Sequence, residues 1–157
     1  MKSKWLSRIL FLSAGIVLGI IIASSFIIKA AKTASALVSL SSRAWESDQA
    51  MHAYLSDKPE IAAYALNHFI SVLQPFYDDK NRDEFPEATA QDLAFAYIRL
   101  GNISKFENNP NEAEVFYNKG YTIYKRYCSD SAKEVPSREK LVELINKLDA
   151  QSKSKKH

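Results

Sequence analysis

The apolar positions along the chain follow two different patterns. Residues 9–28 contain no charged side chain, whereas from residue 43 onward apolar residues recur every three or four positions. Twenty helical residues rising about 1.5 Å each span about the 30 Å of a hydrocarbon core, so the first pattern predicts a transmembrane helix. The second pattern is typical of helices that bury one face. The chain is therefore predicted to be all-α, with a membrane helix followed by a small helical domain.

Prolines divide the amphipathic part into helices. Helical spacing without Pro or Gly extends from residue 30 to residue 55, with an apolar face from residue 45 onward, so this helix should continue unbroken from the membrane. Pro59 suits the first position of the next helix, which should run to about residue 73. Residues 75–91 form an insertion rich in charged side chains, and Pro86 within it begins another helix.

The stretch from residue 92 to 126 indicates a helix, a tight turn and a second helix. Asn109 and Pro110 mark the turn, as an N-cap and a first-position proline. The spacing resembles a tetratricopeptide repeat, in which a Leu-Gly pair is followed by a small residue, an aromatic residue and another small residue at fixed intervals. The residues that carry the resemblance are Leu100, Gly101, Ala113, Tyr117 and Gly120. Small residues at such positions are expected where two antiparallel helices approach closely.

A weaker copy of the same pattern precedes this stretch and predicts a degenerate repeat over residues 43–76. The resemblance implies a small array of helical hairpins over residues 43–150, closed by a C-terminal helix that Ser137 caps. The apolar face of that closing helix carries Leu141, Leu144, Ile145 and Leu148. A basic tail, residues 151–157, follows.

The N-terminal segment, residues 1–32, should be a retained anchor followed by a helical stalk over residues 33–42. Its apolar run exceeds the 7–15 residues usual in a secretory signal peptide, which favours retention over cleavage after the span. One face of the span carries residues that would let another helix pack closely, although such residues are also common in single-pass helices without that role. They are Gly15, Gly19 and Ala23.

Charge separates the two parts of the chain. Five of the 21 basic residues lie within residues 1–32, and no acidic residue precedes Glu46. The 16 remaining basic residues face 18 acidic ones, a net charge of −2, so the overall charge of +3 does not indicate nucleic-acid binding. The basic leader favours an N-terminus in the cytoplasm. In a bacterial cell this places the helical domain on the outer side of the inner membrane.

Candidate chemistry is sparse. The single cysteine, Cys128, excludes an internal disulfide, and His52 and His68 have no metal-binding spacing. Residues 79–90 begin like a calcium loop but hold Glu and Ala where an EF-hand requires Gly and Glu. We therefore expect neither an enzyme nor a cofactor or metal site.

The resemblance instead implies a protein–protein interaction module, a scaffold, assembly or chaperone-like accessory subunit that holds a protein partner near the membrane. In the family, first helices line the concave binding surface. The corresponding face of this chain carries Phe95, Ile98, Asn102 and Lys105. The closing helix could instead fill this groove, which would make Phe95 and Ile98 core residues.

A second functional interpretation stays open. The protein could be a structural subunit of a membrane complex, either a homodimer or one of several subunits, whose transmembrane helix does most of the binding. Under that interpretation the helical domain would only cover a neighbouring subunit.

Overall fold

The structure is a computed structural model that describes residue 24 and residues 29–31, 33–34, 37–38, 40–56, 58–79, 85–130 and 134–154. The chain divides into two units, Met1–Ser41 and Ser42–His157. In the first unit, the described residues are helical. None of the helices in the described part is long and apolar enough to cross a membrane. The predicted span, residues 9–28, lies outside the described residues except for residue 24, and so do Gly15, Gly19 and Ala23.

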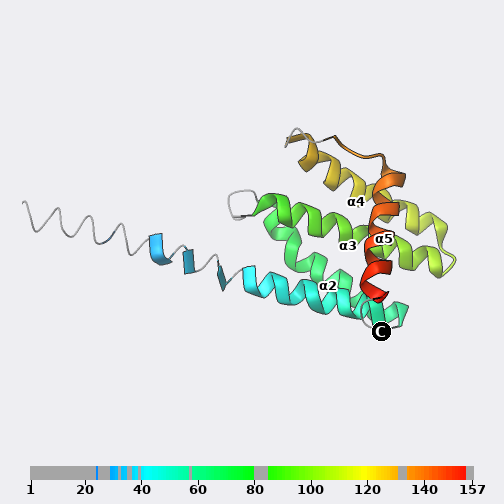
Figure 1. The fold of residues 1–157 in the computed structure, drawn as a ribbon, viewed down its shortest axis with the longest axis horizontal. Coiled ribbons are helices and arrows are strands. Elements are labelled where there is room, and N and C mark those ends of the chain that lie inside the picture. The colour runs from blue at the N-terminus through cyan, green and yellow to red at the C-terminus, as the bar shows by residue number, and fades with distance from the viewer. Residues whose placement is uncertain are drawn as a thin grey trace, which may run out of the picture. The chain divides into compact units, whose positions relative to one another are not determined.

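The second unit consists of α-helices packed as antiparallel hairpins (Figure 1). A helical segment, residues 42–56, is followed by α2 (Pro59–Asp78), α3 (Pro86–Phe106), α4 (Pro110–Asp130) and α5 (Arg138–Ser154). Helix α3 packs against both α2 and α4, and α5 crosses over α3 and α4. The all-α prediction is confirmed for the described residues.

Three of these helices begin with proline, as predicted. Pro59, Pro86 and Pro110 are the first residues of α2, α3 and α4. At this position the missing N–H would have no partner within the helix, and the fixed φ angle of proline already suits the helix.

Helix α2 is longer than predicted, because it continues through Pro75 to Asp78. Pro75 lies in the last turn, so its ring removes one main-chain hydrogen bond near the end of the helix. The flanking side chains hold that turn in place: Leu73 is fully buried, and the guanidinium of Arg43 lies 4.0 Å from the ring centre of Phe76. Tertiary packing therefore outweighs the local tendency of proline to end a helix.

Main-chain hydrogen bonds close the turn between α3 and α4. Asn108 has a φ of 58°, in the left-handed region that asparagine tolerates better than most residues. The N–H of Asn109 donates to the carbonyl of Ser104 at 2.8 Å, and that of Asn108 donates to the carbonyl of Lys105 at 3.2 Å. The side-chain oxygen of Asn109 then accepts from the N–H of Glu112 at 3.4 Å. The predicted break and N-cap are confirmed.

The two glycines of the repeat-like pattern lie where α3 and α4 come closest. A Cβ atom on Gly101 would lie 2.6 Å from Cε1 of Tyr117 and 3.1 Å from the carbonyl oxygen of Ala113. A Cβ atom on Gly120 would lie 2.7 Å from the carbonyl oxygen of Ala94. Carbon atoms in ordinary contact are about 3.5–4.0 Å apart, so larger residues would force the helices apart. The predicted close approach is confirmed.

The buried apolar side chains form two clusters. The larger one joins the segment 42–56 to α2, α3 and α4, and its buried members are Ala50, Ala62, Leu66, Phe69, Ile70, Leu73, Ala90, Leu93, Ala94, Ala96, Tyr97, Leu100, Ile103 and Ile123. The smaller one joins α5 to α3 and α4, and it consists of Ile98, Ala113, Tyr117, Leu141 and Ile145. Helix α3 contributes to both clusters and is the central element of the unit.

Candidate binding site

The four residues predicted to face a partner all lie on α3, but they differ in burial and contacts. Ile98 is fully buried beneath α5, in the smaller cluster. Phe95 is partly buried and stacks on Tyr124 of α4, with ring centres 6.3 Å apart. Lys105 is exposed. Helix α5 therefore covers part of this face, as the alternative interpretation of the sequence anticipates, and contact of the four residues with a partner stays a prediction.

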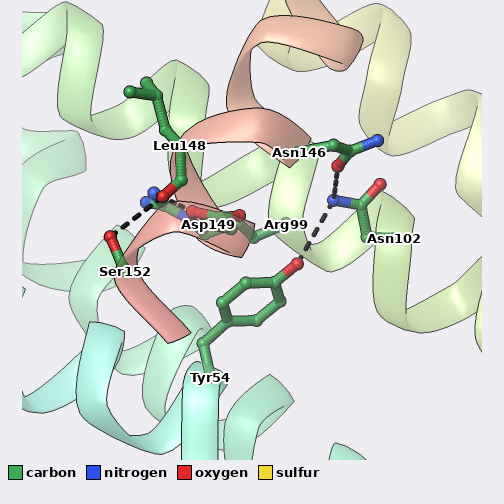
Figure 2. Close-up of polar contacts among 7 residues, drawn as sticks. All are labelled: Tyr54, Arg99, Asn102, Asn146, Leu148, Asp149 and Ser152. Atoms are coloured by element: carbon green, nitrogen blue, oxygen red, sulfur yellow. Dashed lines mark hydrogen bonds and ion pairs between the residues drawn. The ribbon is translucent and has the colours of Figure 1, made fainter. Parts of the chain in front are cut away.

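Asn102, the fourth residue, is the centre of a polar cluster that links separate helices. Its side-chain nitrogen donates to the hydroxyl of Tyr54 at 3.2 Å and to the side-chain oxygen of Asn146 at 2.8 Å (Figure 2). Its side-chain oxygen accepts from the hydroxyl of Tyr117 at 2.9 Å. Both N–H donors of the amide are used, so Asn102 joins α3 to the segment 42–56, to α4 and to α5.

A buried ion pair lies beside this cluster. The guanidinium of Arg99 donates to both carboxylate oxygens of Asp149 on α5, with a shortest distance of 2.8 Å (Figure 2). The Arg99 and Asp149 side chains are only 15% and 7% exposed. The guanidinium also lies 5.7 Å from the ring centre of Tyr54 and 5.9 Å from that of Phe95. This forked geometry suits a carboxylate and holds α5 in a defined register against α3.

A groove of about 350 Å³ opens next to the polar cluster. Its apolar wall is formed by Pro59 and Ala62 of α2 and by Ile103 and Phe106 of α3. Its polar groups come from Tyr54, Asn102 and Lys153. The side chain of Phe106 is 76% exposed although it is large and aromatic. An exposed aromatic side chain beside an apolar groove is a suitable anchor for a binding partner.

A second hollow of about 290 Å³, between α4 and α5, is acidic. Glu114, Glu139 and Glu143 line it together with Arg138. Arg138 already pairs with Glu114 at 2.6 Å and with Glu139 at 3.3 Å, and Glu143 pairs with Lys147 at 2.8 Å. Each of the three acids already has a basic partner within the fold, so the apolar groove is the stronger candidate for a binding site.

Burial changes the acidity of several groups in the site. It raises the pKa of Tyr54, an effect that hydrogen bonding from Asn102 partly opposes. Burial likewise raises the pKa of the Tyr117 hydroxyl, and it raises the pKa of the Asp92 carboxyl despite the opposing charges of Arg99 and Arg43. Both tyrosines are therefore neutral hydrogen-bonding groups at physiological pH.

Four residues of the site were not predicted from the sequence: Tyr54, Arg99, Asp149 and Lys153. A signal for two of them was present, because Asp149 follows Ile145 by four residues on the apolar face of the closing helix. A charged residue on an otherwise apolar face usually has a buried partner. That the partner is Arg99, fifty positions earlier, depends on how the helices pack.

Within the described residues, no set of three or more His, Cys, Asp and Glu side chains could hold a metal ion. His68 instead lies beside Glu46, with 3.4 Å between Nε2 and the carboxylate.

No protein-family model matches this chain, and neither a curated protein nor a solved structure shows significant similarity to it. The candidate site is therefore defined by its own geometry.

Proposed function

We propose that this protein is a membrane-anchored interaction module, built from tetratricopeptide-like helices, that holds a protein partner near the membrane. The repeat assignment is supported by the spacing of Gly101, Ala113, Tyr117 and Gly120 together with the close approach of α3 and α4 at these residues. The anchor is supported by the uncharged run over residues 9–28. The module acts as a scaffold, assembly factor or chaperone-like accessory subunit.

The groove beside Asn102 is the observation that carries this proposal. Its apolar wall suits one aliphatic or aromatic side chain of a partner, and the exposed ring of Phe106 supplies additional contact area. Lys153 also lines the groove, and its side chain carries an ammonium group with three hydrogen-bond donors and a positive charge. The partner is therefore an extended or helical peptide with an apolar residue next to a carboxylate or an amide.

A position-specific photo-crosslink tests the groove. The crosslinking amino acid replaces Phe106 in the full chain, and in a matched control it replaces Tyr64, which is also 76% exposed but does not line the groove. We expect one protein to be captured from membranes at position 106 and not at position 64. In a separate pull-down without the crosslinking amino acid, we expect Phe106→Ala to weaken binding of the same protein about tenfold or more, since truncating an anchoring aromatic side chain costs about 1–2 kcal/mol or more. Equal capture at both positions would contradict the groove as the binding site.

The membrane anchor is tested separately. Carbonate extraction should leave the protein in the membrane fraction, because an uninterrupted apolar helix stays in the bilayer when peripheral proteins are released. In bacterial cells, protease added to the outer side of the inner membrane should digest the helical domain. Recovery of the protein in the soluble fraction would remove the anchor from the proposal.

The alternative of a structural subunit rests on the spacing of Gly15, Gly19 and Ala23. If the transmembrane helix does most of the binding, Gly19→Ile should abolish association with the complex, because the larger side chain prevents close helix packing. If the groove does most of the binding, Gly19→Ile should leave the crosslink at position 106 in place.

A further inference from the structure

Helix α5 contacts the rest of the domain through one narrow face. Leu141 and Ile145 are fully buried, and Asp149 is 5% exposed. These residues are four positions apart, so they lie close to a single line along the helix. Leu144 and Leu148, on the adjoining strip, are 46% and 42% exposed. The surface of α3 and α4 that α5 covers is called its seat below. This seat therefore accepts two apolar side chains and one acid at regular helical spacing.

The larger core cluster contains no residue of α5. Its described members all come from the segment 42–56, α2, α3 and α4, whereas Leu141 and Ile145 pack with Ile98, Ala113 and Tyr117 in the smaller cluster. Phe95 and Tyr124 pack against both clusters, so removing α5 would uncover the smaller apolar surface and part of these two rings. The buried members of the larger cluster all come from the other helices.

The polar contacts of the seat are specific for an acid. The Arg99 guanidinium lies within 6 Å of the ring centres of Tyr54 and Phe95, at 5.7 and 5.9 Å, and donates to both oxygens of Asp149. A helix with a neutral residue in place of Asp149 would cover this guanidinium without supplying a carboxylate, which is costly for a buried charge. Asn102 adds a hydrogen bond to Asn146. Shape and charge together select an amphipathic helix that carries an acid at one fixed position.

We propose that the surface of α3 and α4 beneath α5 is a docking site for a partner helix with apolar residues at positions i and i+4 and an acidic residue at i+8, and that α5 occupies this site until such a helix displaces it. This inference goes beyond the proposed function, because it adds a docking surface next to the groove. The two surfaces share Asn102, and Lys153 of α5 lines the groove, whereas Phe106 belongs to the groove and not to the surface beneath α5.

A peptide titration tests the docking site. The probe is a fluorescent peptide of residues 137–154, titrated into the full chain in detergent and into the Ile145→Asp variant, in which the resident helix is weakened. We expect the peptide to bind the variant at least tenfold more tightly than the wild-type chain, because the resident helix competes in the wild type. Failure of the peptide to bind the variant would overturn the proposal. Unfolding of the variant would also overturn the proposal, because the proposal requires the other helices to stay folded when α5 is displaced.

A charge exchange tests the pairing of Arg99 with an acid. The peptide carrying Asp149→Arg should lose binding to the Ile145→Asp chain, and the additional change Arg99→Asp in the chain should restore it. Equal binding of both peptides to the Ile145→Asp chain would show that the acid is not recognised and would overturn the proposal.

Hydrogen exchange on the wild-type chain supplies an independent measurement. The amides of α5 should exchange through an opening in which the amides of α2 and α3 remain protected. Exchange of α5 only together with α2 and α3 would contradict a displaceable helix. A wild-type dimer in which α5 of one copy crosslinks to α3 of the other would assign the surface to a second copy instead. Phe106 lines the groove and does not contribute to the surface beneath α5, so the crosslink at position 106 and these titrations can fail separately.

Discussion

The close contact between α3 and α4 at Gly120 leads to a prediction about the sign of a stability change. At an exposed helical position, replacing glycine with alanine stabilises a protein by up to about 1 kcal/mol, because alanine has the higher helix propensity. At Gly120 the new Cβ would lie 2.7 Å from the carbonyl oxygen of Ala94, 2.9 Å from Cγ1 of Ile98 and 3.3 Å from Cβ of Tyr97. The nearest of these atoms belongs to the main chain of α3, so relief requires the two helices to separate by roughly half an ångström or more.

Overpacking of this kind costs about 1–3 kcal/mol, which exceeds the propensity gain. We therefore expect Gly120→Ala to lower the free energy of unfolding by about 1–2 kcal/mol, measured by urea unfolding of the full chain in detergent and followed by circular dichroism. Thr122→Ala, at an exposed position of the same helix, is the control and should change stability by less than about 0.5 kcal/mol. A Gly120→Ala protein that is more stable than the wild type would refute the close approach of the two helices.

Three further changes test other parts of the structure by the same unfolding measurement. Asn102→Ala should destabilise the domain by about 1–3 kcal/mol, because it leaves the groups that bond to this amide without a partner, and an unchanged stability would place the amide in solvent. Asn108 has a φ of 58°, so Asn108→Ala should lower the free energy of unfolding by about 1 kcal/mol, whereas Asn108→Gly should leave it unchanged or raise it. Equal effects of the two changes would argue against the left-handed turn. Burial raises the pKa of Asp92, so the folded state favours the protonated carboxyl. The contribution of this group to the free energy of unfolding is therefore lost as pH rises through the pKa of the folded state. Asp92→Asn should therefore stabilise the domain more at pH 7 than at pH 3, and a larger gain at pH 3 would contradict that sign.

Local features of the fold could be predicted from the sequence, because they depend on interactions within one or two helical turns. The positions of Pro59, Pro86 and Pro110 at helix starts follow from the geometry of the proline ring. The cap at Asn109 follows from its short polar side chain. The contact at Gly120 joins two helices, and it was predicted from the resemblance to a tetratricopeptide repeat rather than from local interactions.

The candidate site was predicted only in part. Asn102 was expected to be an open amide on a binding face, but its donors are used by Tyr54 and Asn146, which lie 48 and 44 positions away in the sequence. Ile98 was placed on the same face, and α5 covers it. Periodicity identifies which side of a helix is apolar, but it does not identify which other helix packs there.

The sequence by itself therefore determined the helical class, the starts of three helices, the turn at Asn109 and Pro110, and the need for small residues between α3 and α4. Tertiary structure alone decided the continuation of α2 through Pro75, the pairing of Arg99 with Asp149 and the groove beside Phe106. The reason is the range of the forces involved. Caps and propensities act between residues a few positions apart, whereas burial and ion pairing depend on which distant segments the folded chain brings into contact.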